Sequence, residues 1–198
     1  MVTPYHIILA SNSPRRKELL SGLDLDYEVK VLPDIEETYP ETLPTEEIPL
    51  FIAEEKAAAY QQMMADNDLI VTADTVVVLG DEVLGKPADL DDARRMLREL
   101  SGRTHQVITG VCLMTKDKKR SFAVTTDVTF KALTDEEIDY YVETYQPLDK
   151  AGAYGIQEWI GFIGVTGING SYFNVMGLPV QRIYSELQII VNQLEKVE

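Results

Sequence analysis

The sequence is poor in cysteine and histidine and contains no long apolar run. Its single cysteine, Cys112, cannot form an intrachain disulfide, and the Cys and His residues have no zinc-binding spacing. No apolar stretch approaches the ~20 residues of a membrane-spanning helix. The N-terminal segment lacks a basic region ahead of its short apolar stretch, so we expect no signal peptide and a cytoplasmic protein.

Basic residues are scarce relative to acidic ones. Lys and Arg together number 18 against 33 Asp and Glu, which gives a formal net charge of -15 over 198 residues. A chain with this charge repels nucleic acids and anionic lipid surfaces, so we expect neither as a partner. An anionic small molecule would need a locally basic site or a divalent metal. With 45% hydrophobic residues, the chain is expected to fold as a single domain over residues 1–198.

The pattern of apolar residues predicts an α/β fold. Strands and helices alternate in the first half, and two long β-type runs follow one another in the middle of the chain. This arrangement favours a mixed sheet with flanking helices. Glycines are concentrated in residues 149–174, which we expect to be mostly loop or short strand. The predicted strands cover 5–10, 27–32, 69–79, 82–85, 106–115 and 120–131, and the predicted helices cover 14–20, 48–65, 90–100, 134–144 and 180–194. Gly80 and Asp81 are predicted to form a two-residue hairpin turn, and Thr134 and Glu137 have the spacing of a helix-capping pattern.

A polar and basic segment follows the first predicted strand. It contains Ser11, Ser13, Pro14, Arg15 and Arg16, and the Ser13-Pro14 pair matches the N-cap and first position of a helix. Strand-to-helix loops are common ligand sites in α/β folds, and helix starts attract anions. Arginine also matches the oxygens of a phosphate group. The alternative is a capped helix whose arginines are simply solvated.

Asp74 is a carboxylate inside the apolar run of residues 69–79. A carboxylate there is costly to bury unless it is paired, hydrogen-bonded or bound to a metal. Such a group can hold a divalent cation or take a proton from water. The alternative is an Asp that faces solvent from an edge strand.

Three further charged residues are weaker candidates. Lys86 follows the predicted hairpin in the sequence LGKP, and Lys56 lies on the predicted helix 48–65. Each lysine taken alone is more often a solvated surface residue than a ligand. Glu37 lies in an acidic loop, where the simplest interpretation is solubility.

The histidines and the cysteine do not form a catalytic triad. We interpret His6 as packing beside the first strand, His105 as a loop residue and Cys112 as an inert core thiol. Trp159 is interpreted as a packing anchor. The sequence contains no Walker A, GxGxxG, HExxH or GxSxG motif. The residues together indicate metal-assisted phosphoryl or pyrophosphoryl hydrolysis, without specifying the substrate.

Six ordered sequence blocks carry a resemblance to a known family. They are ILASNSPRRKELL, EEKAAA, ADTVVVLGDEVLGKP, LSGRTHQVITGV, DKAGAYGIQ and INGSYFNVMGLP. With these blocks the sequence resembles the Maf family of nucleoside triphosphate pyrophosphatases over nearly its whole length.

The resemblance implies an activity and a fold. Members of this family hydrolyse a nucleoside triphosphate to the monophosphate and pyrophosphate with a divalent cation, Mg²⁺ or Mn²⁺. The implied fold is an elongated two-lobed domain with a central cleft, built on a mixed twisted sheet and similar to inosine triphosphatases. A homodimer is also implied.

The resemblance assigns roles to residues of this sequence. Asp74 corresponds to the proton acceptor that activates water. Arg15, Thr75 and Gln157 lie where the family selects the base, and their combination is similar to the dTTP/UTP subgroup, with modified pyrimidine nucleotides as further candidates. The implied phosphate-binding residues are Ser11, Arg16, Lys56 and Lys86, and the implied metal ligands are Glu37 and Asp74.

Two alternatives to this activity stay open. The family has been associated with arrest of cell division and septum formation, so a regulatory nucleotide-binding protein is one alternative. A binding protein has no need of a carboxylate placed to activate water, so the role of Asp74 separates the two. The other alternative is a general phosphatase, which releases orthophosphate instead of pyrophosphate.

Overall fold

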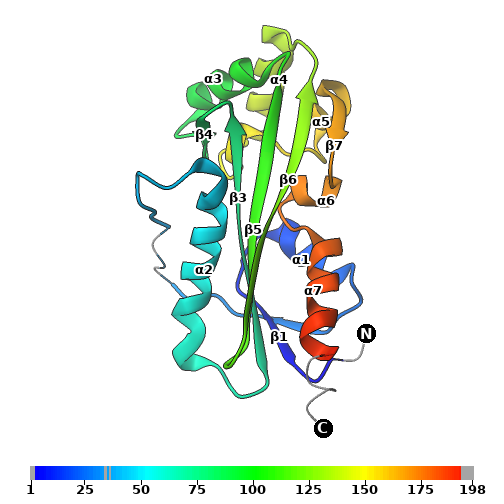
Figure 1. Cartoon of the computed structure of the whole chain (residues 1–198). Coiled ribbons are helices and arrows are strands. Elements are labelled where there is room, and N and C mark those ends of the chain that lie inside the picture. The colour runs from blue at the N-terminus through cyan, green and yellow to red at the C-terminus, as the bar shows by residue number, and fades with distance from the viewer. Residues whose placement is uncertain (1–2, 34, 36, 193–198) are drawn as a thin grey trace. The chain divides into compact units, whose positions relative to one another are not determined.

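A computed structural model describes residues 3–33, 35 and 37–192 of the chain. Within these residues seven strands form one sheet in the order β2-β1-β3-β5-β6-β7, and β4 pairs with β3 (Figure 1). The strands are β1 (His6–Leu9), β2 (Tyr27–Val29), β3 (Asp68–Leu79), β4 (Glu82–Leu84), β5 (Thr104–Met114), β6 (Lys119–Phe130) and β7 (Val165–Asn169). The α-helices are α1 (Pro14–Ser21), α2 (Ile48–Tyr60), α3 (Leu90–Leu100), α4 (Asp135–Tyr145), α5 (Trp159–Gly164), α6 (Tyr172–Met176) and α7 (Val180–Asn192).

The sheet contains both parallel and antiparallel pairs. β1 pairs in parallel with β2 and with β3, whereas β3 pairs antiparallel with β4, and β6 pairs antiparallel with β7. The predicted mixed sheet with flanking helices is therefore confirmed. None of the helices in the described part of the chain has the length and apolar character that crossing a bilayer requires.

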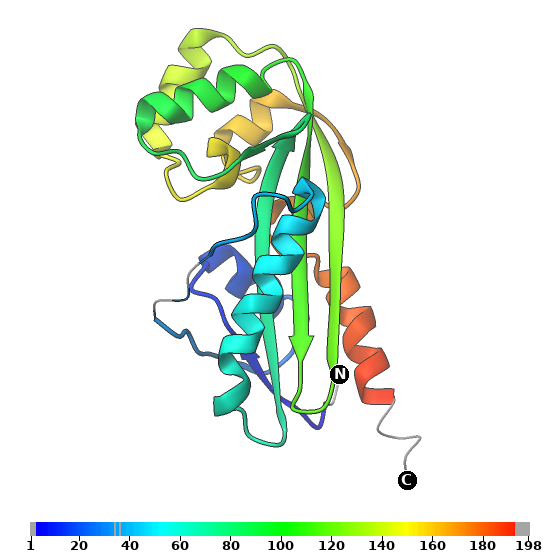
Figure 2. The ribbon, with the colours of Figure 1, turned by 60° about the vertical axis from the view of Figure 1, so that its left-hand side comes forward.

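One compact unit comprises Met1–Asp74, Thr109–Val124 and Gly177–Glu198. Within this unit α2 and α7 lie on opposite sides of the strands (Figures 1 and 2). α2 approaches β5 closely, since a Cβ added to Gly110 would lie 2.3 Å from the backbone nitrogen of Leu50. A core cluster in this unit contains Ile8, Ala53, Ala57, Tyr60, Met64, Ile70, Cys112 and Met114. Burial of Cys112 in this cluster agrees with its interpretation as a core thiol.

The other unit comprises Thr75–Ile108 and Thr125–Met176. Arg94 on α3 forms ion pairs with two carboxylates on α4, at 2.8 Å from Asp139 and 3.2 Å from Glu143. β3 and β4 form the predicted hairpin, and Gly80 in its turn has a φ of +63°, which favours glycine. The capping pattern predicted for α4 is also present, because the Thr134 side chain accepts from the Glu137 backbone and the Glu137 side chain accepts from the Thr134 backbone.

The predicted C-terminal end of one helix was wrong. The helix predicted over 48–65 ends at Tyr60 and continues as a short 3-10 turn, Gln61–Met63. Asp68 on β3 accepts a hydrogen bond from the backbone of Ala65 at 2.8 Å, so a side chain from the next strand stabilises the chain reversal. The Ala-rich helical spacing that predicted this helix does not reveal the Asp68 contact, so it does not predict where the helix ends. The last two residues of the predicted helix 180–194 lie outside the described residues.

The prediction that residues 149–174 are mostly loop or short strand was also wrong in part. This region contains α5 and α6 as well as β7. Gly161 allows α5 to pack closely on the segment before it, because a Cβ on Gly161 would lie 1.7 Å from the carbonyl oxygen of Ile156. Composition alone does not distinguish glycines that allow close packing from glycines that allow turns.

Candidate active site

Asp74 lies on a strand inside the sheet. β3 has β1 on one side and β5 on the other, and Asp74 is only 9% exposed. The alternative of a solvent-facing Asp on an edge strand is therefore wrong. Thr72, two residues earlier on the same face of β3, is fully buried and donates to the Ala53 carbonyl of α2 at 2.6 Å. Asp74 lies two residues after Thr72 on the strand, and Lys56 lies three residues after Ala53 on the helix. Each pair faces the same side of its element, so Asp74 and Lys56 also come together.

Lys56 is shared by two carboxylates. Its Nζ lies 2.7 Å from Glu37 Oε1 and 3.1 Å from Asp74 Oδ1. The Lys56 side chain is 15% exposed, whereas that of Glu37 is 50% exposed. The interpretation of Lys56 as a solvated surface lysine is therefore wrong, and Glu37 does more than confer solubility. The structure brings together Glu37, Lys56 and Asp74, which the sequence separates widely.

The groups around Asp74 have opposing effects on its pKa. Burial raises the pKa of Asp74, the positive charges of Lys56 and Arg16 lower it, and Glu37 raises it again, so that the net shift is upward. A carboxylate with a raised pKa is a stronger base than an exposed one while the nearby cations keep its ionised form accessible. This combination suits a group that accepts a proton during a reaction.

Arg16 is held firmly at the start of α1. Ser13 caps the helix as predicted, and its side chain accepts from the Arg16 backbone at 3.4 Å. The guanidinium donates from Nε to the Gly177 carbonyl at 2.8 Å and from Nη1 to the Ala73 carbonyl at 2.9 Å. Burial lowers the pKa of Arg16, and Asp74 opposes that shift. Arg16 is therefore not the solvated arginine of the alternative interpretation, because it fixes the backbone next to Asp74.

Ser11 and Arg15 lie in the same unit as Asp74. Ser11 is buried, and its hydroxyl accepts from the backbone of Ser13 at 3.2 Å, which shapes the loop before α1. Arg15 is the second residue of α1 and is half-buried. A phosphate-binding role for Ser11 and a base-selecting role for Arg15 stay predictions.

The other predicted site residues belong to the second unit. Thr75 is half-buried on β3, Lys86 is exposed just after β4, and Gln157 is half-buried just ahead of α5. Oε1 of Gln157 is buried and has no hydrogen-bond partner among the described residues. A buried acceptor without a partner is costly, and a ligand donor such as an imide N–H would satisfy it. The predicted meeting of Thr75 and Gln157 with Arg15 stays a prediction.

Comparison with known proteins decides the family. Residues 6–190 match the family described as Maf-like protein. This chain belongs to the Maf family. Relatives named dTTP/UTP pyrophosphatase include those of Phocaeicola vulgatus, 70% identical with 93% of this chain and 95% of the relative covered, and of Bacteroides fragilis ATCC 25285, 62% identical with the same coverage. A solved nucleoside-triphosphatase / dITP/XTP pyrophosphatase from Mycobacterium abscessus is 15% identical and covers 97% of this chain and 98% of that one, with a TM-score of 0.47.

Sequence reasoning missed the buried pair of His105 and Tyr154 in this Maf chain. The prediction of a loop position for His105 was wrong, because it lies on β5 and is 1% exposed. Its Nε2 lies 2.6 Å from the Tyr154 hydroxyl, and both rings pack edge-on against Phe130. Burial lowers the pKa of His105 to about 4, so the ring is neutral near neutral pH. The polar residues Arg103 and Thr104 just before His105 give no sign in the sequence that its ring is buried.

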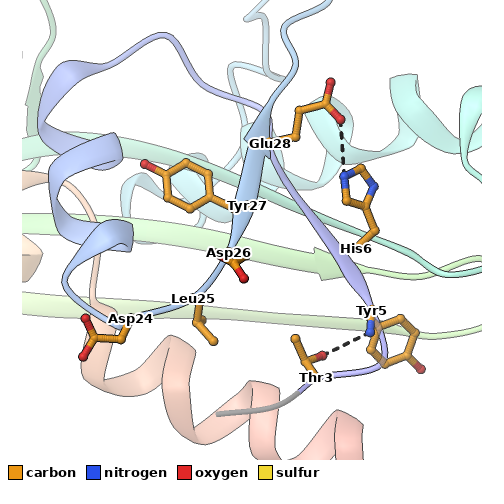
Figure 3. A pocket seen from close by; sticks show the side chains of 8 residues that line it. All are labelled: Thr3, Tyr5, His6, Asp24, Leu25, Asp26, Tyr27 and Glu28. Atoms are coloured by element: carbon orange, nitrogen blue, oxygen red, sulfur yellow. Dashed lines mark hydrogen bonds and ion pairs between the residues drawn. The ribbon is translucent and has the colours of Figure 1, made fainter.

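A separate pocket of about 500 Å³ opens in the first unit (Figure 3). His6 bridges two of its neighbouring strands, with Nε2 at 3.3 Å from Glu28 and Nδ1 at 3.0 Å from Asp68. His6 therefore forms ion pairs when protonated, in addition to packing beside β1 as predicted. None of the predicted site residues lines this pocket, which is formed by Thr3, Tyr5, His6, Asp24, Leu25, Asp26, Tyr27 and Glu28.

Proposed function

We propose that this Maf chain is a nucleoside triphosphate pyrophosphatase that hydrolyses dTTP and UTP to the nucleoside monophosphate and pyrophosphate. The observation that carries the proposal is the buried Asp74 paired with Lys56 at 3.1 Å, beside Glu37 and Arg16. The names of the similar proteins from Phocaeicola vulgatus and Bacteroides fragilis support this choice of substrates. Such an activity removes surplus or modified pyrimidine nucleotides and suits the cytoplasm, where nucleotide pools lie.

Asp74 acts as the general base in this proposal. The water oxygen forms a bond to the α-phosphorus, and the water proton passes to the Asp74 carboxylate. The bond from the α-phosphorus to the bridging oxygen breaks, and pyrophosphate leaves with that oxygen. A general base of this kind contributes about 10²–10⁴-fold to a rate. The raised pKa of Asp74 strengthens it as a proton acceptor.

Basic residues would bind the phosphate groups. A triphosphate brings several negative charges to a chain whose net charge is -15. Lys56 already lies between two carboxylates, and Lys86 is exposed and able to reach an anion. Arg16 fixes the backbone at Ala73, next to the base, and its guanidinium contributes positive charge there. Positioned cations stabilise the charge that spreads over the phosphoryl oxygens in the transition state.

Glu37 and Asp74 are the residues that would hold a divalent metal. Their donor chemistry fits Mg²⁺ or Mn²⁺, since Mg²⁺ is typically bound through one or two carboxylates plus substrate phosphates. Among the described residues no group of three or more His, Cys, Asp or Glu side chains forms a protein-only metal site. A bound cation would neutralise phosphate charge, and the substrate would complete its coordination.

The test is a nucleotide panel with the purified protein. dTTP, UTP, CTP, GTP and ATP are incubated with Mg²⁺ or Mn²⁺, and pyrophosphate and orthophosphate are measured separately. We expect pyrophosphate from dTTP and UTP, with loss of activity in EDTA. Orthophosphate as the first product would indicate a general phosphatase. Tight nucleotide binding without turnover would indicate the regulatory alternative. Activity that persists in EDTA would contradict the proposal that hydrolysis requires a divalent metal.

A further inference from the structure

The segment that carries Gln157 is held at both ends by a single buried hydroxyl. Tyr141 of α4 is fully buried, and its hydroxyl accepts from the Gly155 backbone N–H at 3.0 Å. The same hydroxyl donates to Glu158 Oε2 at 2.5 Å. The Glu158 backbone also donates to the Gly155 carbonyl at 3.0 Å. Gly155 and Glu158 lie on either side of Gln157. The Tyr141 hydroxyl links them through one hydrogen bond to each, and we call this link the Tyr141 bridge.

The bridge extends to Lys150. Its Nζ lies 3.1 Å from Glu158 Oε1 and 2.9 Å from Asp149 Oδ1, and the Lys150 side chain is largely buried. Gly155 packs against this pair, because a Cβ there would lie 2.9 Å from Lys150 Cε and 3.1 Å from Glu158 Cδ. Both carboxylate oxygens of Glu158 therefore have partners, and the backbone at Gly155 packs closely against the side chains of Lys150 and Glu158.

The protonation state of Tyr141 suits this bridge. Burial raises the pKa of Tyr141, and its hydrogen bond to Glu158 raises it further. The hydroxyl therefore stays protonated and keeps donating to Glu158 over the whole working pH range. Ala153, nearby in the same segment, has a φ of +58°, a left-handed conformation that non-glycine residues keep only where their surroundings hold them.

We propose that Tyr141 is a positioning residue that orients Gln157 for reading the base of the nucleotide. The inference rests on the proposed function, in which Gln157 contacts a pyrimidine. Oε1 of Gln157 is buried without a partner among the described residues. Whether it can accept a hydrogen bond from the base of a nucleotide therefore depends on the backbone conformation of residues 155–158. Removing the Tyr141 hydroxyl takes away one hydrogen bond at each end of that segment.

The test separates binding of the base from binding of the phosphates. Tyr141→Phe removes the bridge and keeps the ring. Tyr145→Phe is the matched control, since Tyr145 stacks on Tyr141 one helical turn away with ring centroids 5.1 Å apart and is partly exposed. The ligands are dTMP, which carries the base, and pyrophosphate, which does not. The sole tryptophan, Trp159, lies two residues after Gln157 and provides a fluorescence signal from the segment itself.

In Tyr141→Phe we expect the Kd for dTMP to rise ~10-fold, the effect of losing about one hydrogen bond, while the Kd for pyrophosphate stays unchanged. KM for dTTP should rise by a similar factor with kcat much less affected, and the Trp159 emission should shift. Tyr145→Phe should resemble the wild type in all of these measurements. A folded Tyr141→Phe protein with wild-type dTMP affinity would overturn the inference, as would equal weakening of dTMP and pyrophosphate.

A second pair of variants guards against poor folding of Tyr141→Phe. Glu158→Gln keeps an oxygen that accepts from Tyr141, whereas Glu158→Ala does not. We expect Glu158→Gln to retain more dTMP affinity than Glu158→Ala, and equal losses in the two would contradict the bridge. The wild type serves as the control for the proposed function. If the wild type neither binds dTMP nor hydrolyses dTTP, the proposed function fails, whereas an active wild type with an unaffected Tyr141→Phe rejects only the positioning role.

Discussion

Lys56 on α2 and Asp74 on β3 form an ion pair in which Nζ lies 3.1 Å from Oδ1 and both side chains are largely buried. Glu37 shares the same lysine at 2.7 Å from a much more exposed position. One cation thus links the proposed base to the second carboxylate of the site. This arrangement underlies the first two predictions.

Asp74→Asn should bind nucleotide but lose most of its turnover. The amide is close in shape to the carboxylate but cannot accept the proton, so kcat should fall about 10²–10⁴-fold. The measurement is pyrophosphate release from dTTP, with dTMP binding as the control for an intact site. Titration of Mg²⁺ against rate distinguishes a lost base from a lost metal ligand. Near wild-type turnover in a folded Asp74→Asn protein would remove Asp74 from the mechanism.

Lys56 and Glu37 should show coupled effects on activity. Lys56→Gln leaves Glu37 and Asp74 without their shared cation, so it should reduce kcat/KM strongly, and Glu37→Gln should change the effect of that substitution. In a double-mutant cycle on kcat/KM for dTTP we expect a coupling of about 0.5–3 kcal/mol. Lys116→Gln, which removes an exposed lysine paired with Asp66 in the same unit, is the control. Additive effects of the two substitutions would mean that the pair does not act as one unit.

Gln157→Glu should impair pyrimidine nucleotides selectively. The change replaces an amide donor with a group that only accepts, and it places a carboxylate where Oε1 is buried. We expect kcat/KM for dTTP to fall about 10–100-fold relative to that for GTP or ATP. The melting temperature serves as the control, because a role confined to holding the segment would lower stability and affect all nucleotides alike. An unchanged ratio in a stable variant would exclude a base-reading role for Gln157.

His105 should make the stability of the protein depend on pH. Its pKa is lowered from 6.5 to about 4 by burial, so between these values the unfolded chain binds the proton and the folded chain does not. Stability from the neutral ring is complete above pH 6.5 and is lost as the pH falls toward about 4, by at most about 3 kcal/mol.

The measurement for His105 is the free energy of unfolding in urea as a function of pH, for the wild type and for His105→Gln. The variant should lose less stability than the wild type as the pH falls, because it lacks the titrating ring. His6→Gln controls for the only other histidine. Parallel pH curves for the wild type and His105→Gln would contradict a buried neutral His105.

Many elements of the fold followed from short-range patterns. The helix at Leu90–Leu100, the hairpin at Gly80 and the caps formed by Ser13 and by Thr134 all occur as predicted. Caps and turns depend on residues within a few positions of one another, so the local sequence contains the information that forms them. The C-terminal end of α2 and the helices after residue 149 differ because a side-chain hydrogen bond and close packing at a glycine shape the backbone there, and apolar periodicity does not report either.

The sequence by itself determined the charge, the alternating strands and helices, the Maf-like blocks and the identity of the candidate residues. Only the tertiary structure decided which of them are buried and paired. Lys56 and Lys86 look equally ordinary in the sequence, yet one is buried between two carboxylates and the other is exposed. The bridge from Tyr141 to Gly155 and Glu158 likewise has no sequence pattern. The physical reason is that desolvation and hydrogen bonding depend on contacts between residues far apart in the chain, which no local periodicity contains.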